Sequence, residues 1–286
     1  MNLDDLFVMS QYLAPQKFIS RSAGRLAECK IPSIKNTFIE RFVEHYGVNM
    51  AEAEVEDPRA YAHFNDFFTR ALKADARPVN QDESVIVSPV DGAVSQLGKI
   101  ERGQIFQAKG QSFNVTELLG GDAALAQSFM GGDFATIYLS PKDYHRIHMP
   151  LKGTLREMVH IPGKLFSVNP ATAEKVPSLF ARNERVAAIF DTEAGPMAMV
   201  LVGAMIVASI ETVWSGLVAP AQNNVKHFQY GDSQAAVCLD KGEEMGRFKL
   251  GSTVVLLFPE GKTNFETSMA AESVVRMGER FGQINS

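Results

Sequence analysis

Short apolar runs separated by turn residues dominate the chain from Ser84 onward. Turn signals such as Val90-Asp91-Gly92 and the segment Asp191–Pro196 lie between several of these runs, which is typical of strands joined by turns. We find no internal repeat and no alternation of strands with helices. The pattern therefore predicts an α+β fold with a β-rich domain of mainly antiparallel strands, and it disfavours a doubly wound sheet. The predicted strands are Val85–Val87, Ala93–Ile100, Phe134–Leu139, Thr154–His160, Val186–Phe190, Met197–Val202, Ile206–Val213, Val225–Tyr230 and Thr253–Phe258.

Helical periodicity marks the beginning of the chain instead. The apolar positions within residues 3–13 predict a short helix that ends near Pro15, because a helix usually stops before proline. A second apolar pattern predicts a helix over residues 33–45, and a third predicts one over residues 63–72. We therefore divide the chain into an N-terminal segment of amphipathic helices, residues 1–50, and a β-rich catalytic domain, residues 51–286.

The overall charge conceals a local basic segment. The 286 residues are 45% hydrophobic and 21% charged, as in a folded globular protein, and the net charge of −5 argues against a general nucleic-acid binder. Between Pro15 and Lys35, however, Glu28 is the only acid, and the basic residues are Lys17, Arg21, Arg25, Lys30 and Lys35. The first three recur every four residues and share one helix face, which suits an anionic bilayer surface. Taken alone, the residues slightly favour the alternative that these helices pack on the domain with solvated charges.

Several classes of protein are disfavoured by what the chain lacks. The longest nearly apolar run, residues 197–210, is shorter than the roughly 20 residues of a transmembrane helix, and Gly203 divides it, so we predict two buried strands there. The N-terminus has no basic region followed by an apolar stretch, which argues against a signal peptide. Cys29 and Cys238 have no metal-binding or disulfide spacing, which favours a reducing compartment.

Two histidines in a polar cluster are the first candidates for chemistry. His145 and His148 lie within Tyr138–Pro150, directly after a predicted buried strand. Their spacing would place both on one helix face and permit a metal site, but no third ligand is near and Pro141 and Pro150 bracket a stretch that we expect to be a loop. General acid–base catalysis is the better functional interpretation, since histidine titrates near neutrality. An ordinary surface loop is an equally good interpretation at this point.

An aspartate and a serine complete a possible nucleophilic set. Asp91 lies in a turn, where aspartate before glycine is common, so an ordinary turn is favoured for that residue alone. Ser252 follows Gly251 at the start of a predicted apolar strand, after a glycine-containing segment, Gly242–Phe248, that can hold the chain in an unusual conformation. An aspartate, a histidine and a serine are the groups needed to activate a hydroxyl nucleophile. Sequence motifs of phosphate-binding loops, dinucleotide-binding folds, zinc proteases and α/β-hydrolases are absent.

Six blocks in order along the chain resemble the phosphatidylserine decarboxylase proenzymes of the compact bacterial type. The blocks are FNDFFTR (Phe64–Arg70), SPVDG (Ser88–Gly92), YLSPKDYHRIHMP (Tyr138–Pro150), HIPGKLFSVNP (His160–Pro170), LFARNERV (Leu179–Val186) and GEEMGRFKLGST (Gly242–Thr253). Each block alone would be a weak signal, but six in order that end in LGST are very specific. We see no departure from the family pattern at the positions that matter.

The resemblance implies an enzyme that makes its own cofactor from its chain. In such an enzyme Ser252 attacks the carbonyl of Gly251, and self-cleavage between these residues leaves a pyruvoyl group at position 252. By analogy with the family, Asp91, His148 and Ser252 form the proteolytic triad, with His148 as the base and Asp91 as its orienter. Phosphatidylserine would then lose CO2 through a Schiff base with the pyruvoyl group, which acts as an electron sink, and would yield phosphatidylethanolamine. His145 is the candidate for proton transfer in this step, and no metal is required.

The family's lipid substrate also implies where the protein acts. It favours a peripheral protein on the cytoplasmic face of the cell membrane, with the basic N-terminal helices on an anionic surface. The expected partners are phosphatidylserine, that surface and the two chains cut from one precursor, with no nucleic acid; a homo-oligomer is left open. Two other functions are carried forward: a serine hydrolase that uses Asp91, His148 and Ser252 without self-cleavage, and a non-enzymatic β-rich module at a membrane surface. A decarboxylase of a related lipid-serine substrate is also compatible with the sequence.

Overall fold

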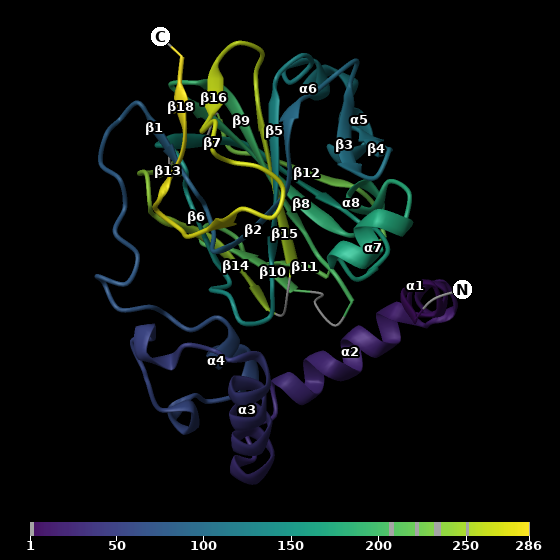
Figure 1. Ribbon diagram of the computed structural model, residues 1–286, viewed down its shortest axis with the longest axis vertical. Helices are drawn as coiled ribbons and strands as arrows, with labels where there is room; N and C mark the ends of the chain where they lie inside the picture. The colour runs from purple at the N-terminus through teal and green to yellow at the C-terminus, as the bar shows by residue number, and fades with distance from the viewer. Residues whose placement is uncertain (1–2, 206–208, 221–222, 232–235, 250–251, 286) are drawn as a thin grey trace.

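The computed structural model describes residues 3–205, 209–220, 223–231, 236–249 and 252–285, with only the backbone of Lys17 and Ser252. In Figure 1 a body of strands fills the upper part of the molecule, and the N-terminal helices lie below it. Helix α2 runs diagonally from α1, beside the body, to α3 and α4 beneath it. These helices are α1 (Leu3–Leu13), α2 (Gln16–Ala27), α3 (Pro32–Tyr46) and α4 (Phe64–Phe68), with short 3₁₀ turns η1 (Met50–Glu52) and η2 (Pro58–Ala60) between α3 and α4.

Antiparallel sheets build the body. In the described part of the chain, the largest sheet has nine strands in the order β12-β7-β8-β9-β15-β5-β2-β17, and β13 pairs with β7 beside this path. Its strands are β2 (Gly92–Lys99), β5 (Asp133–Leu139), β7 (Gly153–Ile161), β8 (Arg185–Thr192), β9 (Gly195–Val202), β12 (Lys226–Gln229), β13 (Cys238–Leu239), β15 (Ser252–Phe258) and β17 (Val274–Val275).

Smaller sheets and short helices complete the body. The sheet with the order β11-β10-β14-β6 consists of β6 (Arg146–His148), β10 (Ser209–Thr212), β11 (Gly216–Ala219) and β14 (Glu244–Lys249). The remaining strands are β1 (Val85–Val87), β16 (Thr263–Phe265) and β18 (Arg280–Ile284), which form one sheet, and the pair β3 (Gln104–Ala108) and β4 (Gln111–Asn114). The short helices are α5 (Val115–Leu118), α6 (Ala123–Gln127), α7 (Pro170–Lys175) and α8 (Leu179–Arg182).

Strand β15 lies inside the core and explains the apolar run at the end of the sequence. Successive side chains of a strand point to opposite faces of the sheet. Val254 and Leu256 accordingly belong to the hydrophobic cluster on one face, whereas Val255 and Leu257 belong to the cluster on the other face. Because helices and other strands cover both faces, β15 reads as a continuous apolar segment and not as an alternating one.

Two buried glutamines attach α1 and the start of α2 to the body. The Oε1 atom of Gln11 accepts a hydrogen bond from the backbone N–H of Ser167 at 2.7 Å, and Oε1 of Gln16 accepts one from the N–H of Leu165 at 2.8 Å. The Nε2 atom of Gln16 donates to the backbone carbonyl of Gln11 at 2.9 Å, so the side chain of Gln16 also ties the start of α2 to α1. An unmade buried hydrogen bond is costly, so these contacts fix the position of α1 on the loop that precedes α7.

Most of the predicted elements are confirmed. The N-terminal helices agree with the predictions within a residue or two, and Gly47 ends α3 in the left-handed region, with φ of 65°. Residues 197–210 do contain two strands, β9 and β10, although 206–208 lie outside the described residues. The predicted helix over residues 63–72 is wrong beyond Phe68. There the chain turns away, because Arg70 is buried against the carbonyl of Lys142 and Leu72 forms a β-bridge with Ala53.

Candidate active site

Asp91 lies between β1 and β2, where it is held by an arginine that sequence analysis did not single out. The Nε atom of Arg77 donates to both carboxylate oxygens of Asp91, at 2.9 and 3.0 Å, and its Nη2 donates to Oδ2 at 2.5 Å. The backbone N–H of Met277 donates to Oδ1 at 2.9 Å. Burial lowers the pKa of Arg77, but its hydrogen bonds and attraction to Asp91 and Glu52 outweigh this and raise the pKa. The pair is therefore a buried, hydrogen-bonded ion pair.

Gly92 allows this aspartate to lie close to the sheet. A Cβ atom at position 92 would lie 2.3 Å from the carbonyl oxygen of Tyr138, a distance that side chains do not tolerate. The next residue, Ala93, pairs with Tyr138, so β2 lies directly beside the end of β5. The turn residue expected from the sequence is thus also a close-packing residue, and it places Asp91 next to the segment that carries the histidines.

His148 is the last residue of β6, and both its ring nitrogens have partners. Its backbone N–H donates to the carbonyl of Pro89 at 2.9 Å, which ties β6 to the turn that contains Asp91. In the ring, Nδ1 donates to the carbonyl of Gly242 at 2.8 Å, which leaves Nε2 to accept from the hydroxyl of Tyr144 at 3.1 Å. Nε2 is therefore the atom of His148 that can take a proton.

The expected hydrogen bond between Asp91 and His148 is not formed in the described part of the chain. Both oxygens of Asp91 bind Arg77, and the carbonyl of Gly242 occupies Nδ1, the position expected for the orienting group. Asp91 still acts on His148 through its charge. Burial lowers the pKa of His148, whereas the Gly242 hydrogen bond and the charges of Glu244 and Asp91 oppose that shift. Asp91 and His148 thus share one corner of the fold, with no hydrogen bond between their described side chains.

His145 is completely buried. Its Nδ1 donates to the carbonyl of Asp143 at 2.8 Å, its ring lies 4.0 Å from that of Phe68, and its Nε2 has no hydrogen-bond partner among the described residues. Burial lowers the pKa of His145 to about 3, and the positive charge of Arg70 acts in the same direction, against the Asp143 hydrogen bond. His145 is therefore neutral near pH 7 and presents a free lone pair on Nε2.

Strand pairing brings the segment that ends at His145 to the two strands on either side of the predicted cleavage site. The backbone N–H of Phe248, in β14, donates to the carbonyl of His145 at 3.0 Å, and Ser252, at the start of β15, pairs with Leu139 of β5. Leu139 is thus the partner of β15 and His145 is the partner of β14. The loop between these two residues therefore connects the partners of the strands on either side of the predicted cleavage site. Gly251 lies outside the described residues, and the description of Ser252 stops at its backbone.

The expected loop between Pro141 and Pro150 is partly wrong. Residues 146–148 form β6, because they pair with β14, a partner that is about a hundred residues away in sequence. Alternating residues of a strand point to opposite sides, so residues three apart do not share a face as they would on a helix. No cluster of three or more histidine, cysteine, aspartate or glutamate residues close enough to hold a metal occurs among the described residues.

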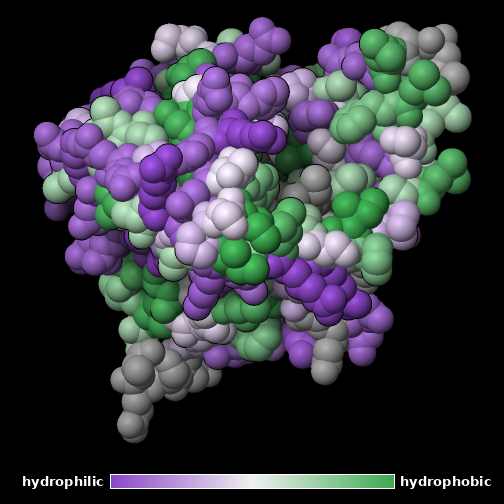
Figure 2. All heavy atoms as spheres, turned by 90° about the horizontal axis from the view of Figure 1, so that it is seen from below, coloured by the Kyte–Doolittle hydropathy of each residue, from purple (hydrophilic) through white to green (hydrophobic). Residues whose placement is uncertain are grey.

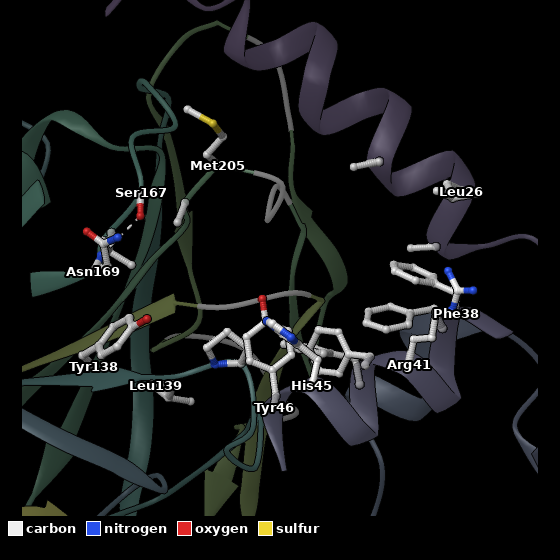
Figure 3. Close-up of a pocket in the computed structure, with 18 residues that line it drawn as sticks. Leu26, Phe38, Arg41, His45, Tyr46, Tyr138, Leu139, Ser167, Asn169 and Met205 are labelled. Carbon is white, nitrogen blue, oxygen red and sulfur yellow. Dashed lines mark hydrogen bonds between the residues drawn. The ribbon is translucent and has the colours of Figure 1, made fainter. Parts of the chain in front are cut away.

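An apolar cavity of about 470 Å³ lies between the N-terminal helices and the end of β5. Figure 3 shows Leu26, Phe38 and Arg41 on the helical side and Tyr138, Ser167 and Asn169 on the side of the body. The lining residues are Ala23, Leu26, Ala27, Phe38, Arg41, Phe42, His45, Tyr46, Phe64, Phe68, Tyr138, Leu139, Pro141, Ser167, Val168, Asn169, Ala204 and Met205. Leu139 is the partner of Ser252, so the cavity adjoins the start of β15.

Three residues of this corner were not predicted as site residues. Tyr144 lies inside the histidine block, and burial raises its pKa to about 12, so it remains a hydrogen-bond donor to His148. Gly242 lies in the segment for which an unusual conformation was predicted, and this is confirmed by its φ of 82°. A Cβ there would lie 2.8 Å from Val79. Arg77 carried no recognisable signal, because its role depends on a partner in a different element.

Comparison with known proteins gives extensive matches. A family described as phosphatidylserine decarboxylase matches residues 64–283, and one described as PSD matches residues 6–47. Proteins named phosphatidylserine decarboxylase proenzyme are similar over nearly their full length. The one from Azotobacter vinelandii is 60% identical over 281 residues, which cover 98% of each chain. The one from Stutzerimonas stutzeri is 62% identical over 98% of this chain and 95% of its own. The one from Bordetella pertussis is 63% identical over 96% and 93%.

Proposed function

Because this chain belongs to the phosphatidylserine decarboxylase family, we propose that it removes CO2 from the serine headgroup of phosphatidylserine and leaves phosphatidylethanolamine. The similarity over nearly the full length of both chains carries the proposal, since it includes every element that builds the site. The matched region, residues 64–283, contains Asp91, His145, His148 and Ser252. The relatives are named proenzymes, so a processed precursor belongs to the same proposal.

Processing is proposed to occur between Gly251 and Ser252. The Oγ atom of Ser252 attacks the carbonyl carbon of Gly251, and Nε2 of His148 takes the hydroxyl proton. The peptide bond becomes an ester, and β-elimination then releases residues 1–251 with a C-terminal carboxylate. The elimination leaves dehydroalanine at position 252. Its enamine tautomerises to an imine, and water hydrolyses the imine, which releases ammonia and leaves the ketone of a pyruvoyl group. His148 suits the role of base because its Nδ1 is fixed on Gly242, which directs the lone pair of the ring to Nε2.

The surroundings of position 252 are compatible with this group. Position 252 begins β15 and borders the apolar cavity through Leu139, so a group there is next to space for a lipid. When formed, the pyruvoyl group supplies the electron sink for loss of the carboxylate. His145 would then transfer protons during decarboxylation. Its unpartnered Nε2 accepts a proton from the substrate amine and returns a proton to the carbon that has lost CO2.

The site is proposed to meet its substrate at the cytoplasmic face of the cell membrane. No helix in the described part of the chain is long and apolar enough to cross a membrane. Leu3, Leu13 and Phe18 are 84%, 88% and 70% exposed. Figure 2, a view from below, shows hydrophobic residues beside hydrophilic ones on the side of the molecule where the N-terminal helices lie. An apolar and basic surface of this kind suits an anionic bilayer, and α2 and α3 also form the wall of the cavity.

Two measurements test the proposed function. Mass spectrometry under denaturing conditions should find two chains, residues 1–251 and 252–286, in active protein. Hydroxylamine should abolish decarboxylation, because it reacts with the ketone of the pyruvoyl group. A serine hydrolase that uses the same residues would instead be active as one intact chain, and a non-enzymatic surface module would bind vesicles without releasing CO2. Active, uncleaved protein that is insensitive to hydroxylamine would contradict the pyruvoyl mechanism.

Removing the basic residues of α2 should weaken membrane binding. Each basic residue near an anionic surface contributes about 1 kcal/mol, so replacing Lys17, Arg21 and Arg25 by glutamine should lower vesicle affinity about fivefold per charge. The effect should decrease at high salt, because salt screens the attraction. Co-sedimentation with phosphatidylglycerol vesicles measures it. Glutamine at Lys99, Lys152 and Arg280, which are exposed on the body, is the matched control. Equal loss of binding in both triple variants would contradict the assignment to α2.

A further inference from the structure

A second hollow, separate from the apolar cavity, lies where α1 joins α2. It has a volume of about 650 Å³ and is formed by the α1–α2 junction on one side and by the loop around residues 163–166 and Arg182 on the other. Its lining residues are Tyr12, Ala14, Pro15, Gln16, Phe18, Arg21, Gly163, Lys164, Phe166 and Arg182. We call it the basic groove, because Arg21, Lys164 and Arg182 line it and none of these described lining residues is acidic.

The charges of the basic groove are not neutralised by neighbouring carboxylates. Arg21, Lys164 and Arg182 form no ion pair within the described residues, although many other basic side chains of the body do. The only hydrogen bond of the Arg182 guanidinium there is a long one, from Nη1 to the carbonyl of Pro177 at 3.4 Å. Three cations around one hollow repel one another, so an anion bound between them would relieve that repulsion.

Aromatic rings hold the central arginine of the groove in place. The guanidinium carbon of Arg182 lies 5.0 Å from the ring centre of Phe166 and 5.7 Å from that of Tyr12, and the two rings lie 5.0 Å apart. Packing on ring faces uses the flat side of a guanidinium and leaves its N–H groups for other partners. The groove walls are also fixed, because buried Gln11 and Gln16 bind the backbone at Ser167 and Leu165. The site is therefore largely preformed.

We propose that the basic groove binds the phosphate of an anionic glycerophospholipid that is not the substrate molecule. Arginine binds phosphate oxygens through paired hydrogen bonds, and lysine adds a second positive charge. A membrane lipid fits better than a free phosphate ion, because Tyr12, Leu13 and Phe18 are 50%, 88% and 70% exposed beside the groove and offer contact to acyl chains. The inference rests on the proposed function in one respect, namely that the N-terminal helices face a bilayer.

Occupation of the groove has a consequence for the apolar cavity. One loop contributes to both: Lys164 and Phe166 line the groove, and Ser167 and Asn169 line the cavity. A lipid phosphate that bridges Arg21 of α2 and Lys164 of this loop would strengthen the docking of α1 and α2 on the body. The wall of the cavity beside Leu139 would be stabilised at the same time. The groove thus connects contact with an anionic membrane to the shape of the proposed substrate site.

Binding can be measured without any catalysis. Uncleaved Ser252→Ala protein would be titrated calorimetrically with dihexanoyl-phosphatidylglycerol, and we expect saturable binding at one site. Replacing both Arg182 and Lys164 by glutamine should weaken it at least tenfold. Arg182→Lys, which keeps the charge but loses the paired donors, should have an intermediate effect. Lys99→Gln with Lys152→Gln removes two exposed charges of the body outside the groove, and this control should leave the affinity unchanged.

The outcomes separate the proposal from its alternatives. Unchanged affinity in the variant that replaces both Arg182 and Lys164, or equal weakening in the Lys99 and Lys152 control, would overturn it. Inorganic phosphate that binds as tightly as the lipid and competes with it would show a general phosphate site and overturn the lipid assignment. Lys164→Gln alone, an exposed substitution, should weaken binding even if changes at Arg182 disturb the fold. Failure of the wild-type protein to decarboxylate phosphatidylserine would disprove the proposed function and leave this binding result intact.

Discussion

The Ser252→Ala variant is expected to remain one chain of 286 residues and to release no CO2 from phosphatidylserine. Alanine has no hydroxyl to attack the carbonyl of Gly251, so neither the ester nor the pyruvoyl group can form. The expected loss is complete, since the group that acts as electron sink is then absent. Denaturing mass spectrometry measures the cleavage, and release of labelled CO2 measures the activity.

A neighbouring hydroxyl provides the control for this experiment. Thr253 is buried, and its Oγ1 has no hydrogen-bond partner among the described residues. Thr253→Val removes that hydroxyl while keeping the shape of the side chain and the strand, so cleavage should proceed. Cleavage of Ser252→Ala at the same bond would refute the assignment of the nucleophile, and a block in both variants would indicate that the strand itself had been disturbed.

His145→Ala is expected to separate the two reactions. The variant should cleave itself, because His148 remains as the base, but decarboxylation should slow by a factor of about 10² to 10⁴, the usual contribution of a positioned acid–base group. The measurement is the rate for the mature protein at saturating lipid, with the extent of cleavage determined on the same sample. If His145→Ala stopped maturation, the division of tasks between the two histidines would be wrong.

Acid titration shows whether His145 is buried and neutral, as the fold requires. The pKa of His145 is about 3 in the folded protein, against 6.5 for an ordinary histidine, so the unfolded chain binds a proton between these values and the folded chain does not. The folded state should therefore lose stability as the pH falls below about 6.5. His145→Gln, which keeps part of the packing on Phe68, should make this loss less steep. An unchanged slope would mean that His145 is not buried in this way.

The sequence predicted the sheet of the body well, because apolar runs such as Val186–Phe190 and Thr253–Phe258 are buried on both faces and carry a strong local signal. Weaker elements were missed. Strand β6 has only three residues and exists because β14 pairs with it, so nothing local marks it. The helix predicted over residues 63–72 is shortened for a similar reason, since Arg70 takes a tertiary partner.

In the candidate site, too, contacts between residues far apart in the chain could not be predicted from the sequence. Asp91, His145 and His148 were found through their residue types and motifs, and the fold does gather their segments in one corner through the contact of His148 with Pro89. Their hydrogen bonds could not be predicted, because Arg77 and Gly242 reach them from elsewhere in the chain. The division at residue 50 remains a prediction. A hydrophobic cluster packs Ile39 of α3 against Phe64 and Phe67 of α4, across that division.

The position of β15 determines how the two fragments stay together after cleavage. Seven residues of β15 pair with β5 and five pair with β9. Further along the chain, β17 pairs with β2 and β18 pairs with β1, so these strands also join residues 252–286 to the rest of the body. A cut before Ser252 therefore breaks one covalent bond but leaves the pairing of β15 with its neighbouring strands intact. The fold must be completed while the chain is continuous, because separated fragments would lose the entropic advantage of a single chain. After the cut, the lifetime of the folded mature protein is set by its unfolding rate. A molecule that unfolds and releases residues 252–286 does not refold to the native structure.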